Sequence, residues 1–321
     1  MIKTKARQVL VNHSALVTLL VLIALASAIM GTTFFSAPNL MNILFNNAVI
    51  GIISLGMTFI IISGGIDLSV GSATAATGIF GLWVMNSLDN IVVGFLAAIA
   101  LGVAIGALNG TLSTRFKIPA FIVTLGMMRV IRALSLHFMN GGGVILDRNI
   151  SAFAFTGFSQ RIGILPLTVV YWIVLAVAMA LISNKTSFGR HIYAVGSNER
   201  ASYLSAVNVK RVKTYVYMVS GALVAIAALA EGSRLGSMNS ATSGNFYELE
   251  AIAAVIIGGT AMSGGRGRIL GTVYGTLILG VINNLMNLMG LPSFLVGAIQ
   301  GAIVILAVLL QRSVEQNERQ F

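Results

Sequence analysis

The sequence predicts an all-α integral membrane protein, a polytopic bundle of about ten transmembrane helices with interrupted helices. Of the 321 residues, 57% are hydrophobic and 9% are charged, whereas soluble domains carry about 25% charged residues. The mean hydropathy is +0.92. Apolar stretches of roughly 17 to 25 residues recur and fit helices that cross about 30 Å of hydrocarbon, while the alternating segments of about 10 residues typical of a membrane β-barrel do not appear.

Ten apolar spans follow one another along the chain. They are about 14–31, 44–62, 67–86, 91–114, 119–138, 167–184, 213–232, 248–262, 269–288 and 293–311. The first span follows basic residues and contains "ASA" at 26–28, so it imitates a secretory signal. Further spans follow at once, and we therefore expect an uncleaved first helix. No low-complexity linker separates the spans, which predicts a single transmembrane domain over 1–321.

The net charge of +11 suggests a nucleic-acid partner by itself, but the positions of the charges favour membrane orientation. If the first basic residues are cytoplasmic and each span crosses once, 15 of the 20 basic residues lie on the cytoplasmic side. These residues are Lys3, Lys5, Arg7, Arg115, Lys117, Lys185, Arg190, Arg200, Lys210, Arg211, Lys213, Arg266, Arg268, Arg312 and Arg319. The positive-inside rule then predicts two cytoplasmic termini and no nucleic-acid partner.

Several kinds of chemistry have no support in the sequence. There is no cysteine, and the three histidines, His13, His137 and His191, are scattered, so neither a thiol nor a metal site is expected. The chain contains no P-loop and no H-E-x-x-H motif. We therefore expect a transport subunit rather than an enzyme, and if ATP supplies the energy, another chain must bind it.

A glycine-rich motif occurs twice with the same spacing. It reads "GGIDLSVGS" over 64–72 and "GGTAMSGGRGR" over 258–268, and each copy follows an apolar run that ends in isoleucines. The matched residues are Gly64, Gly65, Ser69 and Gly71 in the first copy and Gly258, Gly259, Ser263 and Gly265 in the second. The match can arise by chance in a glycine-rich chain. Its physical interpretation is a pair of helix breaks, which membrane proteins tolerate along a cavity and which point to a transport path.

Asp67 is a carboxylate between two long apolar runs, and two interpretations are open. It can cap the N-terminus of the following helix, or it can lie near the substrate path or its gate. The two roles are compatible, and Ser69 and Ser72 can support the same turn.

Other polar residues also lie near the membrane. Arg129 and Arg132 share one face of the fifth span and either snorkel outward or serve a structural or pathway role. At the outer end of the eighth span, Glu248 and Glu250 are candidates for contact with an external partner; Glu248 is otherwise solvated, and Glu250 otherwise pairs with an arginine or caps the helix. The ninth span carries an amide ladder that either bonds neighbouring helices or faces a polyhydroxylated substrate. It consists of Asn283, Asn284 and Asn287.

The inner connection, about 185–212, is one of only two long ones. Ser197 or Asn198 can cap a short helix through "ERASYLSAV". The connection is either an ordinary basic loop or a helix that docks on a cytoplasmic motor subunit, and its length and capping signal favour docking. The docking residues would be Asn198, Glu199, Arg200, Ala201, Tyr203 and Leu204.

Four long motifs resemble the permease subunits of bacterial ribose/galactose-type sugar ABC importers, in the family that includes branched-chain amino-acid permeases. They are "LGMTFIIISGGIDLSVGS" (55–72), "IPAFIVTLGMMRVIRALS" (118–135), "SFGRHIYAVGSNERASYLSAVNVKRVK" (187–213) and "YELEAIAAVIIGGTAMSGGRGRILGT" (247–272). The resemblance covers about residues 40–311. Asp67 and Arg132 match positions where such permeases commonly have the same residues, whereas Glu250 departs from an expected aspartate.

The resemblance implies a multi-pass protein of the bacterial inner membrane that works as a dimer, either with itself or with a related permease. Its partners would be a cytoplasmic ABC ATPase, which carries ATP and Mg²⁺, and a periplasmic sugar-binding protein; the chain itself would bind no cofactor. Residues 198–206 would be the coupling helix, and ATP would drive alternating access. The sugar stays unidentified. The alternatives are an ion-coupled secondary transporter and an ABC permease for a branched-chain amino acid or a nucleoside.

Overall fold

The computed structural model describes residues 14–147, 161–162, 165–292, 295–303, 305–306 and 309. The helices are α2 (Ser14–Met30), α3 (Ala37–Ile62), α4 (Val70–Leu88), α5 (Ile91–Arg115), α6 (Ala120–Phe138), α8 (Leu167–Lys185), α9 (Ser187–Ser197), α10 (Glu199–Leu204), α11 (Val209–Leu235), α12 (Tyr247–Ile257) and α13 (Ile269–Leu288), with a 3₁₀ turn η1 (Gly31–Thr33). Residues 295–303 are also helical. Within this part of the chain, seven helices are long and apolar enough to cross a membrane, which confirms the all-α polytopic fold.

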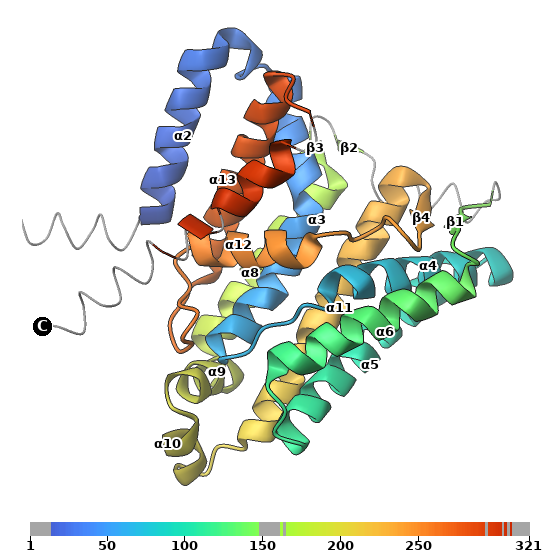
Figure 1. The fold of residues 1–321 in the computed structure, drawn as a ribbon, viewed down its shortest axis with the longest axis vertical. Helices are drawn as coiled ribbons and strands as arrows, with labels where there is room; N and C mark the ends of the chain where they lie inside the picture. The colour runs from blue at the N-terminus through green and yellow to red at the C-terminus, as the bar shows by residue number, and fades with distance from the viewer. Residues whose placement is uncertain are drawn as a thin grey trace, which may run out of the picture.

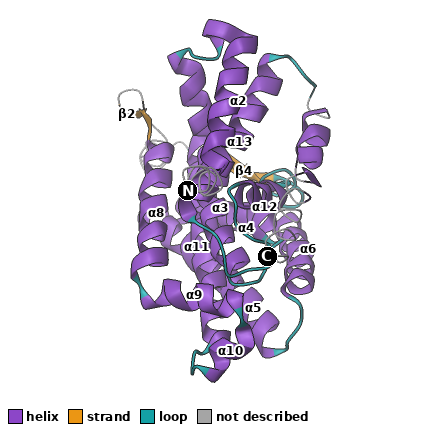
Figure 2. Cartoon of the chain, turned by 90° about the vertical axis from the view of Figure 1, so that its left-hand side faces the viewer, coloured by secondary structure: helices purple, strands orange, loops and turns teal. Residues whose placement is uncertain are grey.

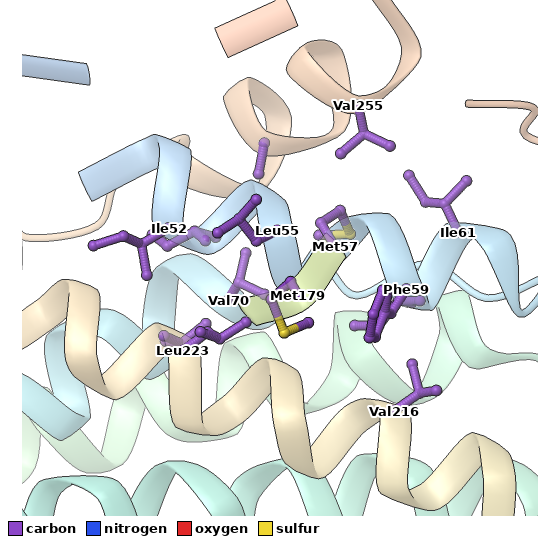
Figure 3. Packing of buried hydrophobic residues seen from close by; sticks show 14 of the residues in the cluster. Ile52, Leu55, Met57, Phe59, Ile61, Val70, Met179, Val216, Leu223 and Val255 are labelled. Atoms are coloured by element: carbon purple, nitrogen blue, oxygen red, sulfur yellow. The ribbon is translucent and has the colours of Figure 1, made fainter. Parts of the chain in front are cut away.

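Helix α3 is the centre of the bundle, and the other elements are arranged around it (Figures 1 and 2). From Ala48 to Ser63 its residues are all buried, because α8, α11, α12 and α13 all pack against it. Figure 3 shows the core where these elements meet, with Ile52, Leu55 and Phe59 of α3 close to Val216 and Leu223 of α11. The all-round apolar sequence of the second predicted span thus reflects burial in protein on every side.

Helices α5 and α11 pack backbone to backbone along a stripe of glycines. A Cβ added at Gly102 would lie 2.3 Å from the carbonyl oxygen of Gly221, and one added at Gly106 would lie 2.1 Å from that of Tyr217. Small residues at four-residue spacing permit this close approach. In a membrane, close packing drives helix association, because contacts between apolar side chains are no more favourable than contacts with lipid. The packing fixes Asn109 of α5 beside the start of α4, which is where the polar residues gather.

Two of the predicted elements differ from those in the structure. The eighth span was expected over 248–262, but α12 has 11 residues, about 16 Å at 1.5 Å per residue, so it is too short to cross the bilayer. It runs across α3 (Figure 1). The inner connection holds a second helix, α9, which the sequence did not predict, before the short helix that it did.

The strands are short and join loops to the bundle. β1 (Gly143–Ile145) pairs antiparallel with β4 (Ser237–Asn239), so the connection after α6 is tied to the end of α11. β2 (Arg161–Ile162) pairs with β3 (Leu165–Pro166) just before α8. Most of the long connection expected at 139–166, and the basic residues of both termini, lie outside the described residues.

Candidate functional site

Helix α3 ends in a turn with a glycine in the left-handed conformation. Gly64 has φ +81°; its N–H donates to the Ile61 carbonyl, and the N–H of Gly65 donates back to the Ile60 carbonyl, each at 2.9 Å. This pattern is a Schellman cap, which requires a residue without a Cβ at the left-handed position. The chain then runs without helix to Val70.

Helix α12 ends in the same kind of turn, but one residue later than the motif spacing suggests. Gly259 has φ +86°, the Gly259 N–H donates to Ile256, and the Thr260 N–H donates to Val255 at 3.2 Å. Gly64 therefore corresponds to Gly259 and not to Gly258, because the left-handed glycine fixes the register of the cap. In this register Asp67 corresponds to Met262, so the acid has no counterpart in the second turn.

Asp67 is buried, with 4% of its surface exposed. Its Oδ1 accepts hydrogen bonds from the Ser69 N–H at 2.8 Å and the Ser69 hydroxyl at 2.6 Å. The N-cap position of α4 is Ser69, so the expectation that Asp67 itself caps the helix is wrong by two residues. Asp67 instead closes an Asx-type turn that leads the chain into the helix, because its short side chain reaches the backbone two residues on.

Three residues that the sequence did not single out fasten this turn to the neighbouring helices. Asn109 of α5 donates to the Ser69 hydroxyl at 2.8 Å. Tyr217 of α11 and Thr124 of α6 donate to the Ile66 carbonyl at 3.1 and 3.3 Å. They come from three different helices far apart in the sequence, and only the tertiary structure brings them to one place.

The segment 63–72 borders two cavities. The larger, about 940 Å³, lies between α10, the start of α11 and the α5–α6 connection; its lining residues include Ser63, Gly64, Gly65, Lys117, Glu199, Arg200, Tyr203, Lys213 and Tyr217. The smaller, about 360 Å³, lies between α6, the start of α4 and the start of α12; its lining residues include Ser72, Arg129, Arg132, Asn245, Phe246 and Glu248. Ser63, Gly64 and Gly65 thus border the larger cavity and Ser72 borders the smaller one, and Asp67 lies between these residues in the sequence.

The structure brings Arg132 and Glu248, 116 positions apart in the sequence, to the smaller cavity. Arg132 is half-buried, and its Nη1 donates to the carbonyl oxygens of Ser240 and Ser243 at 2.8 and 2.9 Å. It therefore holds the loop before α12 against α6 and does not simply extend toward the membrane surface. Arg129, one turn earlier on α6, lines the same cavity and is exposed.

Gly71 has a different role from the one its motif predicted. It lies in the first turn of α4 and not in the broken segment. A Cβ at this position would lie 2.2 Å from the Gly244 carbonyl oxygen and 2.4 Å from Glu248 Oε2. The missing side chain lets the Glu248 carboxylate lie over the N-terminal end of α4, where the helix dipole favours negative charge.

The remaining polar candidates contact other helices. Asn284 exchanges two amide hydrogen bonds with Asn39 of α3, at 2.7 and 3.1 Å. Gln300 donates to Asn283 at 2.8 Å and to the carboxylate of Glu250. Asn287 is exposed near the end of α13. None of these four predicted residues is among those that line the two cavities of the described chain.

The predicted docking helix is α10, six residues long, at one extreme of the molecule (Figure 1). Asn198 caps it by accepting the Ala201 N–H at 2.9 Å, which confirms one of the two expected caps. Glu199 pairs with Lys213 of α11. Tyr203 and Leu204 are 71% and 77% exposed, so a short helix presents two large apolar side chains to its surroundings.

The end of α9, directly before α10, is in contact with both helix breaks. A Cβ at Gly196 would lie 1.7 Å from the Ile62 carbonyl oxygen, and the same oxygen accepts the Gly265 N–H at 2.8 Å. On the other side, Tyr193 of α9 donates to the Gly267 carbonyl at 2.9 Å. We call these three segments, around Ile62, Gly196 and Gly265, the glycine clasp. Only Ser197 and Asn198 lie between Gly196, which contacts both breaks, and the start of α10.

Comparison with known proteins places the chain among transport permeases. Residues 39–308 match the family described as branched-chain amino acid transport system / permease component. The chain is 40% identical over 303 residues to the ribose import permease protein RbsC of Escherichia coli (strain K12), which covers 94% of each chain. It is 36% identical over 318 residues to the fructose import permease protein FrcC of Rhizobium meliloti, covering 96% of this chain and 88% of that one.

A third relative is the xylose transport system permease protein XylH of Haemophilus influenzae (strain ATCC 51907 / DSM 11121 / KW20 / Rd), 32% identical over 360 aligned positions that cover 93% of this chain and 95% of that one. The family match spans most of the sequence, and the relatives align over nearly their whole length. The resemblance drawn from the four motifs is thereby confirmed. The chain belongs to the family of branched-chain amino acid transport system permease components.

Proposed function

We propose that this chain is the permease subunit of an ATP-binding cassette importer for a monosaccharide. The observation that carries the proposal is that one segment, 63–72, which contains the buried Asp67, borders a cavity near each of its ends, because a transporter needs a barrier between two spaces that open alternately. The names of the relatives, which import ribose, fructose and xylose, support a sugar as cargo. The chain would carry no catalytic residue of its own.

The 63–69 turn is the proposed gate. Asp67 holds Ser69, and Tyr217 and Thr124 hold the Ile66 carbonyl from two other helices. These are local hydrogen bonds to a segment without helical structure, so small shifts of α6 or α11 change its position without unfolding a helix. Gate opening would join the larger cavity beside α10 to the smaller one beside α12.

The energy would come from a separate cytoplasmic ATPase that binds ATP and Mg²⁺ and docks on α10. Its closure would move α10, and the glycine clasp would carry that movement to both helix breaks, since backbone contacts without intervening side chains are stiff. A periplasmic binding protein would deliver the sugar to the opposite face. This assignment places the chain in the bacterial inner membrane, with both termini in the cytoplasm.

A second permease, either an identical copy or a related chain, would cover the exposed face of α6. Arg129 is the middle residue of this helix, about 13 Å from either end, and it is exposed. An arginine at the centre of a bilayer costs roughly 2.5–3.5 kcal/mol on insertion scales. A face that carries such a residue is better matched to a second subunit or a watery path than to lipid.

The docking of α10 gives a direct test. Replacing 198–206 by a Gly/Ser linker removes the Asn198 cap and both exposed apolar side chains. We expect the complex to lose its ATPase subunit during purification and to lose sugar-stimulated ATP hydrolysis. The double variant Tyr203→Ser/Leu204→Ser should weaken co-purification at unchanged permease expression, because it keeps the capped helix. Normal coupling in the linker variant would show that the motor docks elsewhere.

The rival transport mechanism and the rival cargo are tested with the same preparation. Uptake by the purified chain alone on a proton or sodium gradient would replace the importer by a secondary transporter. The family description also names branched-chain amino acids. ATP-dependent uptake of L-leucine, with no uptake of D-ribose, D-fructose or D-xylose, would overturn the sugar assignment.

A further inference from the structure

The smaller cavity contains polar groups from three separate elements around one space. Ser72 comes from α4, Arg129 and Arg132 from α6, Asn245 from the loop before α12 and Glu248 from the first turn of α12. The volume of about 360 Å³ is within the roughly 300–1,000 Å³ range of ligand pockets. In a protein with 9% charged residues, two guanidinium groups and one carboxylate at a single cavity are a marked concentration.

The carboxylate of Glu248 is held in place by the backbone beneath it. Gly71 leaves room for Oε2 over the first turn of α4, and the Gly244 carbonyl fills the adjacent space. Arg132 fixes the other side of the loop through Ser240 and Ser243. The Glu248 carboxylate and the loop that carries Asn245 are therefore positioned by packing before any ligand arrives, which lowers the entropic cost of binding.

Phe246 is the second, independent observation. It has φ +66°, in the left-handed region that bulky residues rarely adopt, and its side chain is 69% exposed while lining the cavity. Backbone conformations of this kind persist where function or surrounding structure demands them. The strained backbone at this position places an aromatic ring at the cavity. A glycine would adopt the same backbone conformation without strain, but it would not supply the ring.

We infer that this cavity is a binding site for a neutral monosaccharide within the permease, an inference that rests on the proposed function. The Glu248 carboxylate would accept hydrogen bonds from two neighbouring hydroxyls, and Arg129, Asn245 and Ser72 would donate to hydroxyl oxygens around the ring. The Phe246 ring would cover the apolar C–H face of the sugar. The polar groups of this cavity come from several directions. They match the hydroxyls of a sugar, which are spread around the edge of its ring, better than a branched-chain amino acid, which carries its polar groups on one carbon.

Binding can be measured on the assembled permease–ATPase complex in lipid nanodiscs, without the binding protein. Saturation-transfer NMR would use D-ribose, D-fructose and D-xylose as probes and L-leucine as the counter-probe. We expect at least one sugar to bind and the isosteric variant Glu248→Gln to weaken its affinity by roughly tenfold, the effect of losing about 1.4 kcal/mol of charge-assisted hydrogen bonding. Glu250→Gln, two residues along the same helix and bonded to Gln300, should bind like the wild type.

The variant Phe246→Gly separates a binding role from a structural one. It relieves the left-handed backbone, so we expect an unchanged or higher melting temperature together with weaker sugar binding. Three results would overturn the inference: no sugar binding by the wild type, unchanged affinity in both Glu248→Gln and Phe246→Gly, or binding of L-leucine in place of the sugars. ATP-dependent sugar uptake by the complete wild-type system tests the importer function separately. If uptake is observed together with any of these three results, the cavity is not the sugar site but the importer function stands.

Discussion

The variant Gly196→Ala is expected to abolish coupled transport and to lower the stability of the permease. Its added Cβ would lie 1.7 Å from the Ile62 carbonyl oxygen and 2.7 Å from the Gly265 nitrogen, so α9 must move away from both helix breaks. Overpacking in a tight core typically costs about 1–3 kcal/mol, and backbone atoms relax less readily than side chains. Thermal unfolding in detergent and sugar uptake by the complete system measure the two effects.

Two further variants sharpen this test of the glycine clasp. Gly297→Ala is the matched control, since a Cβ at that helical glycine meets no atom within 4 Å, and it should behave like the wild type. Tyr193→Phe removes the hydroxyl that donates to the Gly267 carbonyl and also bonds the Ser183 hydroxyl within the α8–α9 pair; we expect ATP hydrolysis to continue while sugar uptake falls. Wild-type uptake by Gly196→Ala at equal expression would mean that the clasp does not carry the coupling.

The variant Asp67→Ala is expected to reduce sugar uptake by roughly tenfold with little loss of assembled complex. It leaves the buried N–H and hydroxyl of Ser69 without their acceptor, and each unsatisfied buried group costs about 1–3 kcal/mol. The cost falls on a turn that is not part of a helix, so we expect the gate to lose its position while the bundle keeps its fold. Uptake per purified complex, together with co-purification of the ATPase, separates the two.

The conservative change distinguishes geometry from charge. Asp67→Asn keeps an oxygen that can accept from Ser69, so it should retain most of the uptake if Asp67 acts by closing the turn. Asp89→Asn, at the other end of α4, is the control for charge removal, because asparagine tolerates the left-handed backbone at that position (φ +44°). If Asp67→Ala transports at the wild-type rate, the turn is not the gate.

The long apolar helices could be predicted from the sequence because a bilayer imposes a simple rule. Each crossing helix needs about 20 consecutive apolar residues, and α2, α5, α6, α8 and α13 therefore lie close to their predicted bounds. The Asn198 cap of α10 was also readable, since capping depends on residues three apart. Both signals are local in the chain.

The length of α12 and the register of the two breaks could not be predicted in the same way. No residue from Ala251 to Met262 is charged, but the helix ends at Ile257, because a left-handed glycine ends it and the following backbone contacts α3 and α9. Two adjacent glycines, Gly258 and Gly259, are equivalent in a sequence pattern. Only the three-dimensional structure decides which of them takes φ +86°.

The sequence by itself therefore determined the class of protein, most of the membrane helices, the two glycine-rich breaks and the short capped helix α10. The tertiary structure decided that Arg132 and Glu248 meet at one cavity, that Asp67 closes a turn in a segment that borders two cavities, and that Gly196, three residues before α10, contacts both breaks. These contacts depend on helices that approach each other backbone to backbone. A glycine in the sequence does not reveal which neighbouring atoms occupy the space that a side chain would fill. Its role in packing is therefore known only once those atoms are located.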